Sequence, residues 1–162
     1  MVVSFANGTA RQRQLVNDAI AECTFQFDRL EATVTFTFEP RIDPALHGGK
    51  FGAVTFVDQL PTHAEIHVLA DLANPRSSFY AGDDFFKESV IHELGHVVTL
   101  SLAPDQQAVI AGALGADYRT QWDLGAVKGW TLSAAEGAAE TFKDLFFPGR
   151  KYNNRTRWRL RS

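Results

Sequence analysis

The sequence has almost no cysteine and no long apolar run. Its single cysteine, Cys23, excludes an internal disulfide framework. No stretch approaches the roughly 20 apolar residues that a membrane-spanning helix needs. Residues 1–8 lack both the basic start and the apolar core of a secretion signal. These absences predict a soluble protein without a membrane partner, for example a cytoplasmic one, and they leave the compartment unknown.

A large charge of either sign is also lacking, because 16 Lys and Arg stand against 19 Asp and Glu in 162 residues, a formal net charge of −3. The basic residues are nevertheless uneven, since residues 150–162 hold six of them and no acidic residue. We therefore predict one domain over residues 1–149 and a basic C-terminal arm over residues 150–162. In the arm, arginines alternate with Trp158 and Leu160. This pattern favours an extended segment with Trp158 and Leu160 packed inward and the arginines in water over a contact with nucleic acid.

Periodicity divides residues 1–149 into a helix, three strands and further helices. Thr9 and Gln12 have the spacing of a capping box before the first helix. Val34, Phe36 and Phe38 alternate with threonines, which is typical of a half-buried strand. This order favours an α+β fold with helices on one side of a small sheet. The predicted helices are residues 10–23, a long helix from Asp83 or Asp84 to before Pro104, a weaker one at 105–118 and a last one from about 133 to before Pro148, and the predicted strands are residues 33–39, 51–58 and 64–70.

The chemistry-bearing motif lies inside the long predicted helix, where residues 92–96 read His-Glu-Leu-Gly-His. On a helix, His92 and His96 lie one turn apart on the same side. Two imidazoles in this arrangement can bind one zinc ion, and Glu93 beside them can reach a water at the metal. The alternative is a buried helix with two hydrogen-bonded histidines. The apolar residues on the opposite side of the helix favour a core-facing side and a cleft-facing side.

A catalytic zinc site needs a third protein ligand and an open fourth position. Thr99 and Leu102 occupy the places where one common pattern has a glycine and a histidine, so that pattern is excluded. Glu136 and Glu140 are again four residues apart, on a helix rich in small residues that permit a close approach. We favour Glu136 as the ligand. Three alternatives stay open: Glu140 as the ligand, a capping box between Ser133 and Glu136, and a solvated face of Glu136, Glu140 and Lys143.

These motifs resemble those of zincin metallopeptidases with a glutamate third ligand. Glu136, Ala139, Glu140 and Phe142 match the glutamate helix of the anthrax lethal factor and Pro-Pro endopeptidase group. The resemblance implies Glu136 as a zinc ligand and Glu140 as the residue that orients a zinc histidine. It also implies a zincin-like fold, in which a small, mostly antiparallel or mixed sheet packs against the metal helix and a C-terminal glutamate helix.

The chain departs from that group at one position. The tyrosine that the group carries seven residues before its glutamate ligand, for transition-state stabilisation, is Gly129 here. Tyr118 and Tyr152 are possible substitutes. The C-terminal half also resembles, more weakly, small proteins encoded among the tail genes of actinobacterial phages.

The predicted third strand, residues 64–70, would form the upper rim of a zincin cleft and pair with substrate backbone. His63, Glu65 and His67 alternate on one face of it. We favour a polar outer face over a substrate contact or a second metal site.

The leading hypothesis is therefore a zinc metallopeptidase with His92, His96 and Glu136 as metal ligands, Glu93 as general base and a peptide or protein as substrate. The alternative is a zinc-stabilised structural or binding protein without catalysis, for example a phage virion component. A nucleic-acid-binding module that uses the basic arm is the weakest of the three.

Overall fold

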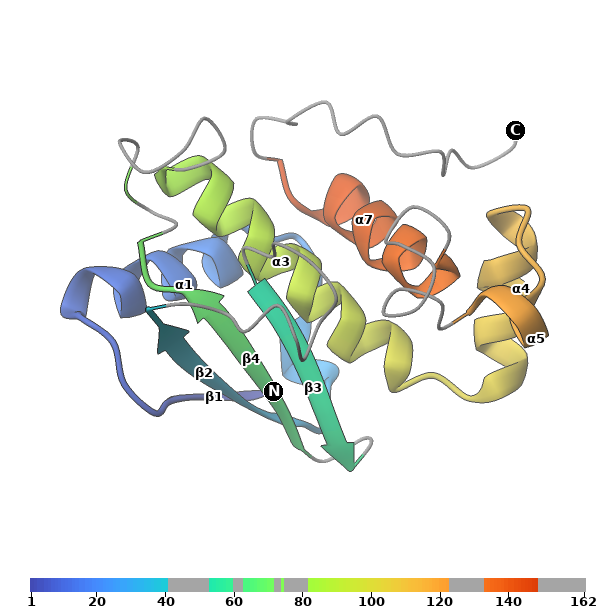
Figure 1. Cartoon of the computed structure of the whole chain (residues 1–162), viewed down its shortest axis with the longest axis horizontal. Coiled ribbons are helices and arrows are strands. Elements are labelled where there is room, and N and C mark those ends of the chain that lie inside the picture. The colour runs from blue at the N-terminus through green and yellow to red at the C-terminus, as the bar shows by residue number, and fades with distance from the viewer. Residues whose placement is uncertain (41–52, 60–62, 72–73, 75–81, 123–132, 149–162) are drawn as a thin grey trace.

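The computed structural model describes residues 1–40, 53–59, 63–71, 74, 82–122 and 133–148, which form a sheet covered by helices (Figure 1). The strands are β1 (Val2–Phe5), β2 (Thr33–Glu39), β3 (Ala53–Gln59) and β4 (His63–Leu69). The helices are α1 (Ala10–Glu22), the short 3-10 helix η1 (Phe27–Arg29), α3 (Asp83–Leu100), α4 (Pro104–Ala113), α5 (Tyr118–Gln121) and α7 (Ala134–Phe146). None of the helices in this described part is long and apolar enough to cross a membrane.

The strand directions correct the predicted fold. We expected three strands in a mostly antiparallel or mixed sheet, and both the strand count and the antiparallel preference are wrong. The sheet has four strands in the order β1-β2-β4-β3, and the pairings of β1 with β2 and of β2 with β4 are both parallel. Only β3 pairs antiparallel, with β4. The α+β class, with both helices and strands, agrees with the structure.

Two features of the chain explain this error. The four-residue strand β1 is too short to show an alternating pattern, and α1 between it and β2 makes the crossover that a parallel pair needs. In addition, β4 lies between β2 and β3, so that neighbours in sequence are not all neighbours in the sheet. An alternating pattern predicts which face of a strand is buried, but it carries no information about the direction of its partner.

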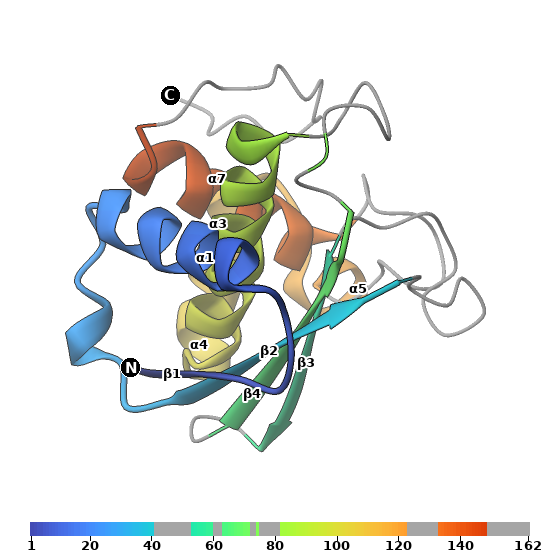
Figure 2. The same cartoon turned by 90° about the vertical axis from the view of Figure 1, so that its left-hand side faces the viewer.

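The buried face of the sheet packs against α1 and α3, as the view in Figure 2 shows. Val34, Phe36 and Phe38 of β2 face the helices, in agreement with the predicted alternation. Ile66 and Val68 extend the same layer on β4. The helix α7 lies against α3, so α3 is enclosed by the sheet, α1 and α7 (Figure 1). The metal motif is thus on the most enclosed helix of the described chain.

Several element ends were predicted well and others were not. The capping box of Thr9 and Gln12 is present at the start of α1. The cap of α3 is Gly82 at φ 122°, and Asp83 and Asp84 lie in its first turn instead of capping it. Pro104 follows the end of α3 at Leu100, as expected, and is itself the first residue of α4, the position where its missing N–H costs least. The weaker helix ends at Ala113, earlier than expected. Residues 51–52 and the basic arm lie outside the described residues.

Candidate metal centre

The two motif histidines lie on the side of α3 that α7 covers. His92 is 8% exposed and His96 is 9% exposed, so both imidazoles are buried. Their ring centroids are 4.9 Å apart and nearly perpendicular. The apolar side of α3 carries Val90, Ile91 and Leu94 into the main core. The helix therefore has an apolar side and a polar side, and α7 packs on the polar side, which was expected to face a cleft.

Gly95 makes the close approach of the two helices possible. A Cβ atom built on Gly95 would lie 3.0 Å from both the Cα and the carbonyl oxygen of Ala139, and 3.2 Å from Cβ of Phe142. Backbone atoms cannot move aside without shifting the helix that carries them. The glycine inside the motif and the alanine of α7 therefore set the distance between the helices, and a short carboxylate side chain on α7 can reach the histidines.

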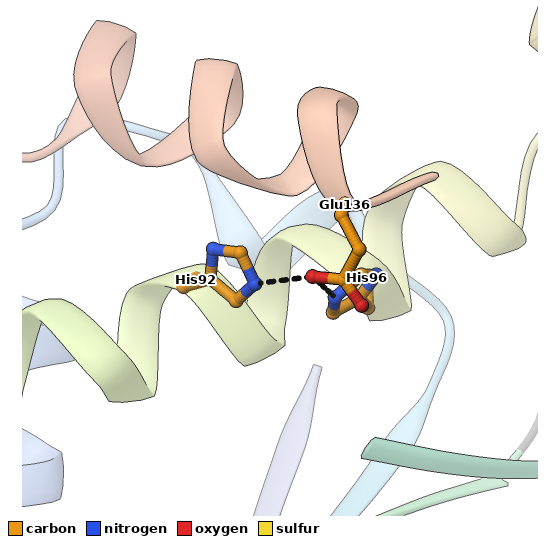
Figure 3. A group of neighbouring side chains, drawn as sticks. All are labelled: His92, His96 and Glu136. Carbon is orange, nitrogen blue, oxygen red and sulfur yellow. Dashed lines mark hydrogen bonds and ion pairs between the residues drawn. The ribbon is translucent and has the colours of Figure 1, made fainter. Parts of the chain in front are cut away.

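Glu136 extends from the first turn of α7 toward the histidines (Figure 3). Its Oε2 atom lies 3.2 Å from Nε2 of His92 and 3.3 Å from Nε2 of His96. The backbone N–H of Glu136 donates to Oγ of Ser133, 3.4 Å away, so Ser133 caps the helix. The carboxylate of Glu136 contacts the histidines, as in the favoured ligand role, and does not complete the alternative capping box. One oxygen of Glu136 thus faces both imidazoles at once.

Glu140 contacts the opposite edge of the first histidine. Its Oε2 atom lies 3.1 Å from Nδ1 of His92, and its Oε1 atom accepts a hydrogen bond from Nζ of Lys143 at 2.5 Å. A carboxylate can only accept, so Nδ1 of His92 carries the proton in this contact. Such a contact fixes the orientation of the ring and directs Nε2 toward Glu136. The structure therefore brings together all four residues that the sequence assigned to the metal and its support.

The charges of these groups depend strongly on one another. Burial lowers the pKa of His92, but hydrogen bonds to Glu136 and Glu140 and the nearby charge of Glu93 act in the other direction and raise it to about 10. Burial raises the pKa of both carboxyl groups, yet their contacts with His92 leave the pKa of Glu136 and of Glu140 below its usual range. His92 thus faces a carboxylate at each ring nitrogen. This arrangement requires a positive centre between Nε2 and Glu136, which a proton or a metal ion can supply.

His92, His96 and Glu136 form the only group of three or more metal-binding side chains that lies close enough to hold one ion, within the part of the chain that the structure describes. Their ligand atoms all lie within 4.8 Å of one another. Glu93 is buried at 6% exposure and is not part of this group. It is close enough for its charge to raise the pKa of His92. Glu93 thus lies beside the candidate metal ligands and is not one of them.

The tyrosine that would stabilise an oxyanion is not found among the described candidates at this centre. The hydroxyl of Tyr118 donates to Oε1 of Gln107 at 3.0 Å, and Gln107 in turn donates to the carbonyl of Thr99 at 3.1 Å. Tyr118 therefore ties α5 to α4 and to the end of α3. Gly129 and Tyr152 lie outside the described residues.

The third predicted strand does not have the position expected for the rim of a cleft. β4 lies between β2 and β3, and β3 is the outer strand of the described sheet on that side. On the exposed face of β4, ring nitrogens of His63 and His67 lie 3.6 Å and 3.5 Å from the carboxylate oxygens of Glu65, and His67 also contacts Glu39 at 3.0 Å. These residues form a polar outer face, as favoured from the sequence. They are not part of the group that is close enough to hold a metal ion.

No family model, curated protein or solved structure matches this chain significantly. The resemblance to the glutamate-ligand zincins therefore stays a prediction from the motifs.

Proposed function

We propose that this protein is a zinc-dependent peptidase that binds its ion through His92, His96 and Glu136. The observation that carries the proposal is the position of one Glu136 oxygen at 3.2 Å and 3.3 Å from the two imidazole Nε2 atoms. Ligands of a tetrahedral zinc ion, at ~2.0–2.2 Å from the metal, stand about 3.3 Å from one another. Two imidazoles and one carboxylate are also a ligand set that catalytic zinc sites use, with a fourth position left for water.

Zinc would supply a Lewis acid that lowers the pKa of a water and polarises a carbonyl oxygen. The protein's own residues do the rest. His92 and His96 offer Nε2 from one rigid helix, and Glu140 keeps the Nδ1 proton of His92 in place. Glu136 brings one negative charge, which balances part of the charge of a dication.

Glu93 is assigned as the general base. It follows His92 directly and is buried beside it, but it is not among the group of three that can share an ion. A carboxylate at this place is not needed to hold a metal. It can accept a proton from an attacking water and pass that proton to the leaving amine. A protein that only stored or structurally used zinc would have no need of it.

One observation favours the second candidate, a zinc-stabilised protein without catalysis. Tyr118, the described tyrosine considered for oxyanion stabilisation, has its hydroxyl engaged with Gln107. A site with ligands and a base but no such helper would bind the metal and cleave poorly. The two candidates share the zinc site and differ in the role of Glu93.

The experiment that separates them combines metal analysis with a digest of a mixed peptide library. The protein purified without chelator should hold about one zinc per chain. The parent should cleave the library, and a chelator should abolish cleavage. Glu93→Gln keeps the shape and should keep the zinc, but hydrolysis should fall by at least the ~10²–10⁴-fold that a general base contributes.

Other outcomes have clear meanings. Folded protein that neither contains zinc nor gains thermal stability from added zinc contradicts the metal site itself. Zinc-loaded parent without any cleavage supports the non-catalytic candidate. Cleavage that persists at the parental rate in Glu93→Gln excludes Glu93 as the base.

A further inference from the structure

The helices α3 and α7 lie side by side (Figure 1). A buried polar seam runs along their contact, well beyond the three candidate ligands. Each helix contributes residues spaced three or four apart, so that they share one face. The helices run antiparallel here, because His96 meets Glu136 at one end and Glu88 meets Lys143 at the other. The seam consists of Glu88, His92 and His96 of α3 and of Glu136, Glu140 and Lys143 of α7.

The far end of the seam is as buried as the metal centre. Lys143 and Glu88 are each 4% exposed. Nζ of Lys143 lies 2.5 Å from Oε1 of Glu140, 3.9 Å from Oε2 of Glu88 and 4.0 Å from Oδ1 of Asp144, which is half exposed. Burying an ammonium group is costly unless charged partners surround it. An apolar side chain at position 143 would avoid this cost. A specific contact of the ammonium group must therefore explain why a lysine is buried here.

The two oxygens of Glu140 supply that reason, because each has a different partner. Oε2 lies 3.1 Å from Nδ1 of His92, and Oε1 accepts from Lys143. The last torsion of a glutamate side chain is broad and weakly preferred, so a carboxylate held at one oxygen can still turn. Lys143 holds the second oxygen and thereby fixes the plane of the carboxylate. The direction of the His92 ring depends on that plane.

The balance of charges in the seam gives Lys143 a second, separate role. With a dication at His92, His96 and Glu136, the seam would hold two positive charges from the ion and one from Lys143, against one negative charge each from Glu88, Glu136 and Glu140. Removing Lys143 would leave an excess of buried negative charge beside the centre, to which Glu93 adds a further carboxylate. The lysine therefore balances the buried carboxylates. The loss of its charge would by itself favour a dication, so weaker zinc binding in its absence would report the lost geometry.

We propose that Lys143 is a positioning residue of the metal centre. It acts through Glu140 on His92 and sets the direction in which Nε2 is offered to the ion, while Glu88 holds Lys143 in place from α3. This inference rests on the proposed zinc site and extends it by two residues that contact neither the ion nor a substrate.

A purely structural ion pair makes a different prediction. It would stabilise the α3–α7 contact equally with and without zinc, and its loss would leave zinc affinity unchanged. A positioning residue changes zinc affinity and the state of the His92 ring. The loss of a partner that orients a metal ligand typically weakens metal binding by ~10–100-fold.

The test compares Lys143→Met with Lys143→Arg and with the matched control Lys87→Met. Lys87 lies on α3, whereas Lys143 lies on α7, and it forms an ion pair of the same 2.5 Å length with the half-exposed Glu22 of α1, away from the seam. Zinc affinity is measured by competition with a chromophoric chelator. The imidazole proton and nitrogen signals of His92 are recorded by NMR in the zinc-loaded protein.

We expect Lys143→Met to bind zinc ~10–100-fold more weakly and to shift the His92 signals. We expect Lys143→Arg to recover most of the affinity and Lys87→Met to match the parent. Parental affinity in Lys143→Met, or an arginine variant no better than the methionine variant, overturns the inference. If Lys143→Met does not fold, Glu88→Gln is tested, and unchanged His92 signals there overturn it too. A parent that binds no zinc contradicts the proposed function instead, so the two failures are distinguishable.

Discussion

At the scale of single residues, Glu136 and Glu140 lie one turn apart on α7 and make different contacts. Glu136 reaches both Nε2 atoms, whereas Glu140 contacts Nδ1 of His92 and Lys143. Glu136→Ala should therefore remove a ligand, and zinc affinity should fall further than the ~10–100-fold expected for Glu140→Ala. Competition titration with a chelator measures both. Glu31→Ala, which removes an exposed glutamate, should bind zinc like the parent. Equal, small effects of both α7 variants would show that the ligand lies elsewhere.

At the scale of elements, the α3–α7 contact depends on one glycine. Gly95→Ala adds a methyl group 3.0 Å from backbone atoms of Ala139. Overpacking of this kind costs ~1–3 kcal/mol, which offsets the ~1 kcal/mol that alanine contributes in a helix. We expect a lower melting temperature and weaker zinc binding, because α7 and its Glu136 must move away from the histidines.

Gly112 in α4 provides the matched control for this substitution. A Cβ atom built there meets nothing within 4 Å. Gly112→Ala should raise stability by ~0.4–1 kcal/mol through the unfolded state and leave zinc binding unchanged. Thermal unfolding of the two variants should thus change in opposite directions. A Gly95→Ala protein with parental stability and affinity would show that the helices do not need this close approach.

At the scale of the whole molecule, the sequence predicted the parts of the site better than the arrangement of the sheet. The i and i+4 spacing fixes which side chains share a helix face, so His92 with His96, and Glu136 with Glu140, were predictable. Small residues around Glu136 indicated a close helix contact, and the contact at Gly95 agrees with that indication. The burial of Lys143 was not predictable, because a lysine at helical spacing from glutamates is more often solvated.

The sheet could not be predicted from the same kind of pattern. Alternation in Thr33–Glu39 correctly gave the buried face of β2, but strand order and direction are set by contacts between distant segments. β4 enters between β2 and β3, and β1 completes the edge through a crossover that involves α1. These are properties of the assembled chain. They decide which strand lies outermost, and so the placement of β4 at a cleft rim was wrong.

The electrostatics of the assembled centre lead to a last prediction, that zinc reverses the pH dependence of stability. In protein freed of zinc by a chelator, the pKa of His92 is raised from 6.5 to about 10. A raised folded-state pKa contributes stability that is fully present below pH 6.5 and is lost as the pH rises toward 10. The lowered pKa values of Glu136 and Glu140 contribute stability that is present above their ordinary value of 4.5 and is lost in acid.

The zinc-free protein should therefore be most stable between the ordinary pKa values of glutamate and histidine, about pH 4.5 to 6.5. It should lose stability in mild base. With excess zinc the sign changes, because the metal binds neutral imidazoles and competes with protons, so stability should rise through pH 6.5. Thermal unfolding over a pH series, with chelator and with zinc, measures both curves. His92→Gln should give one curve under both conditions, since it removes the shared group. Parallel curves for the parent would mean that a proton and zinc do not compete for the same nitrogen. Nε2 of His92 would then need no positive partner.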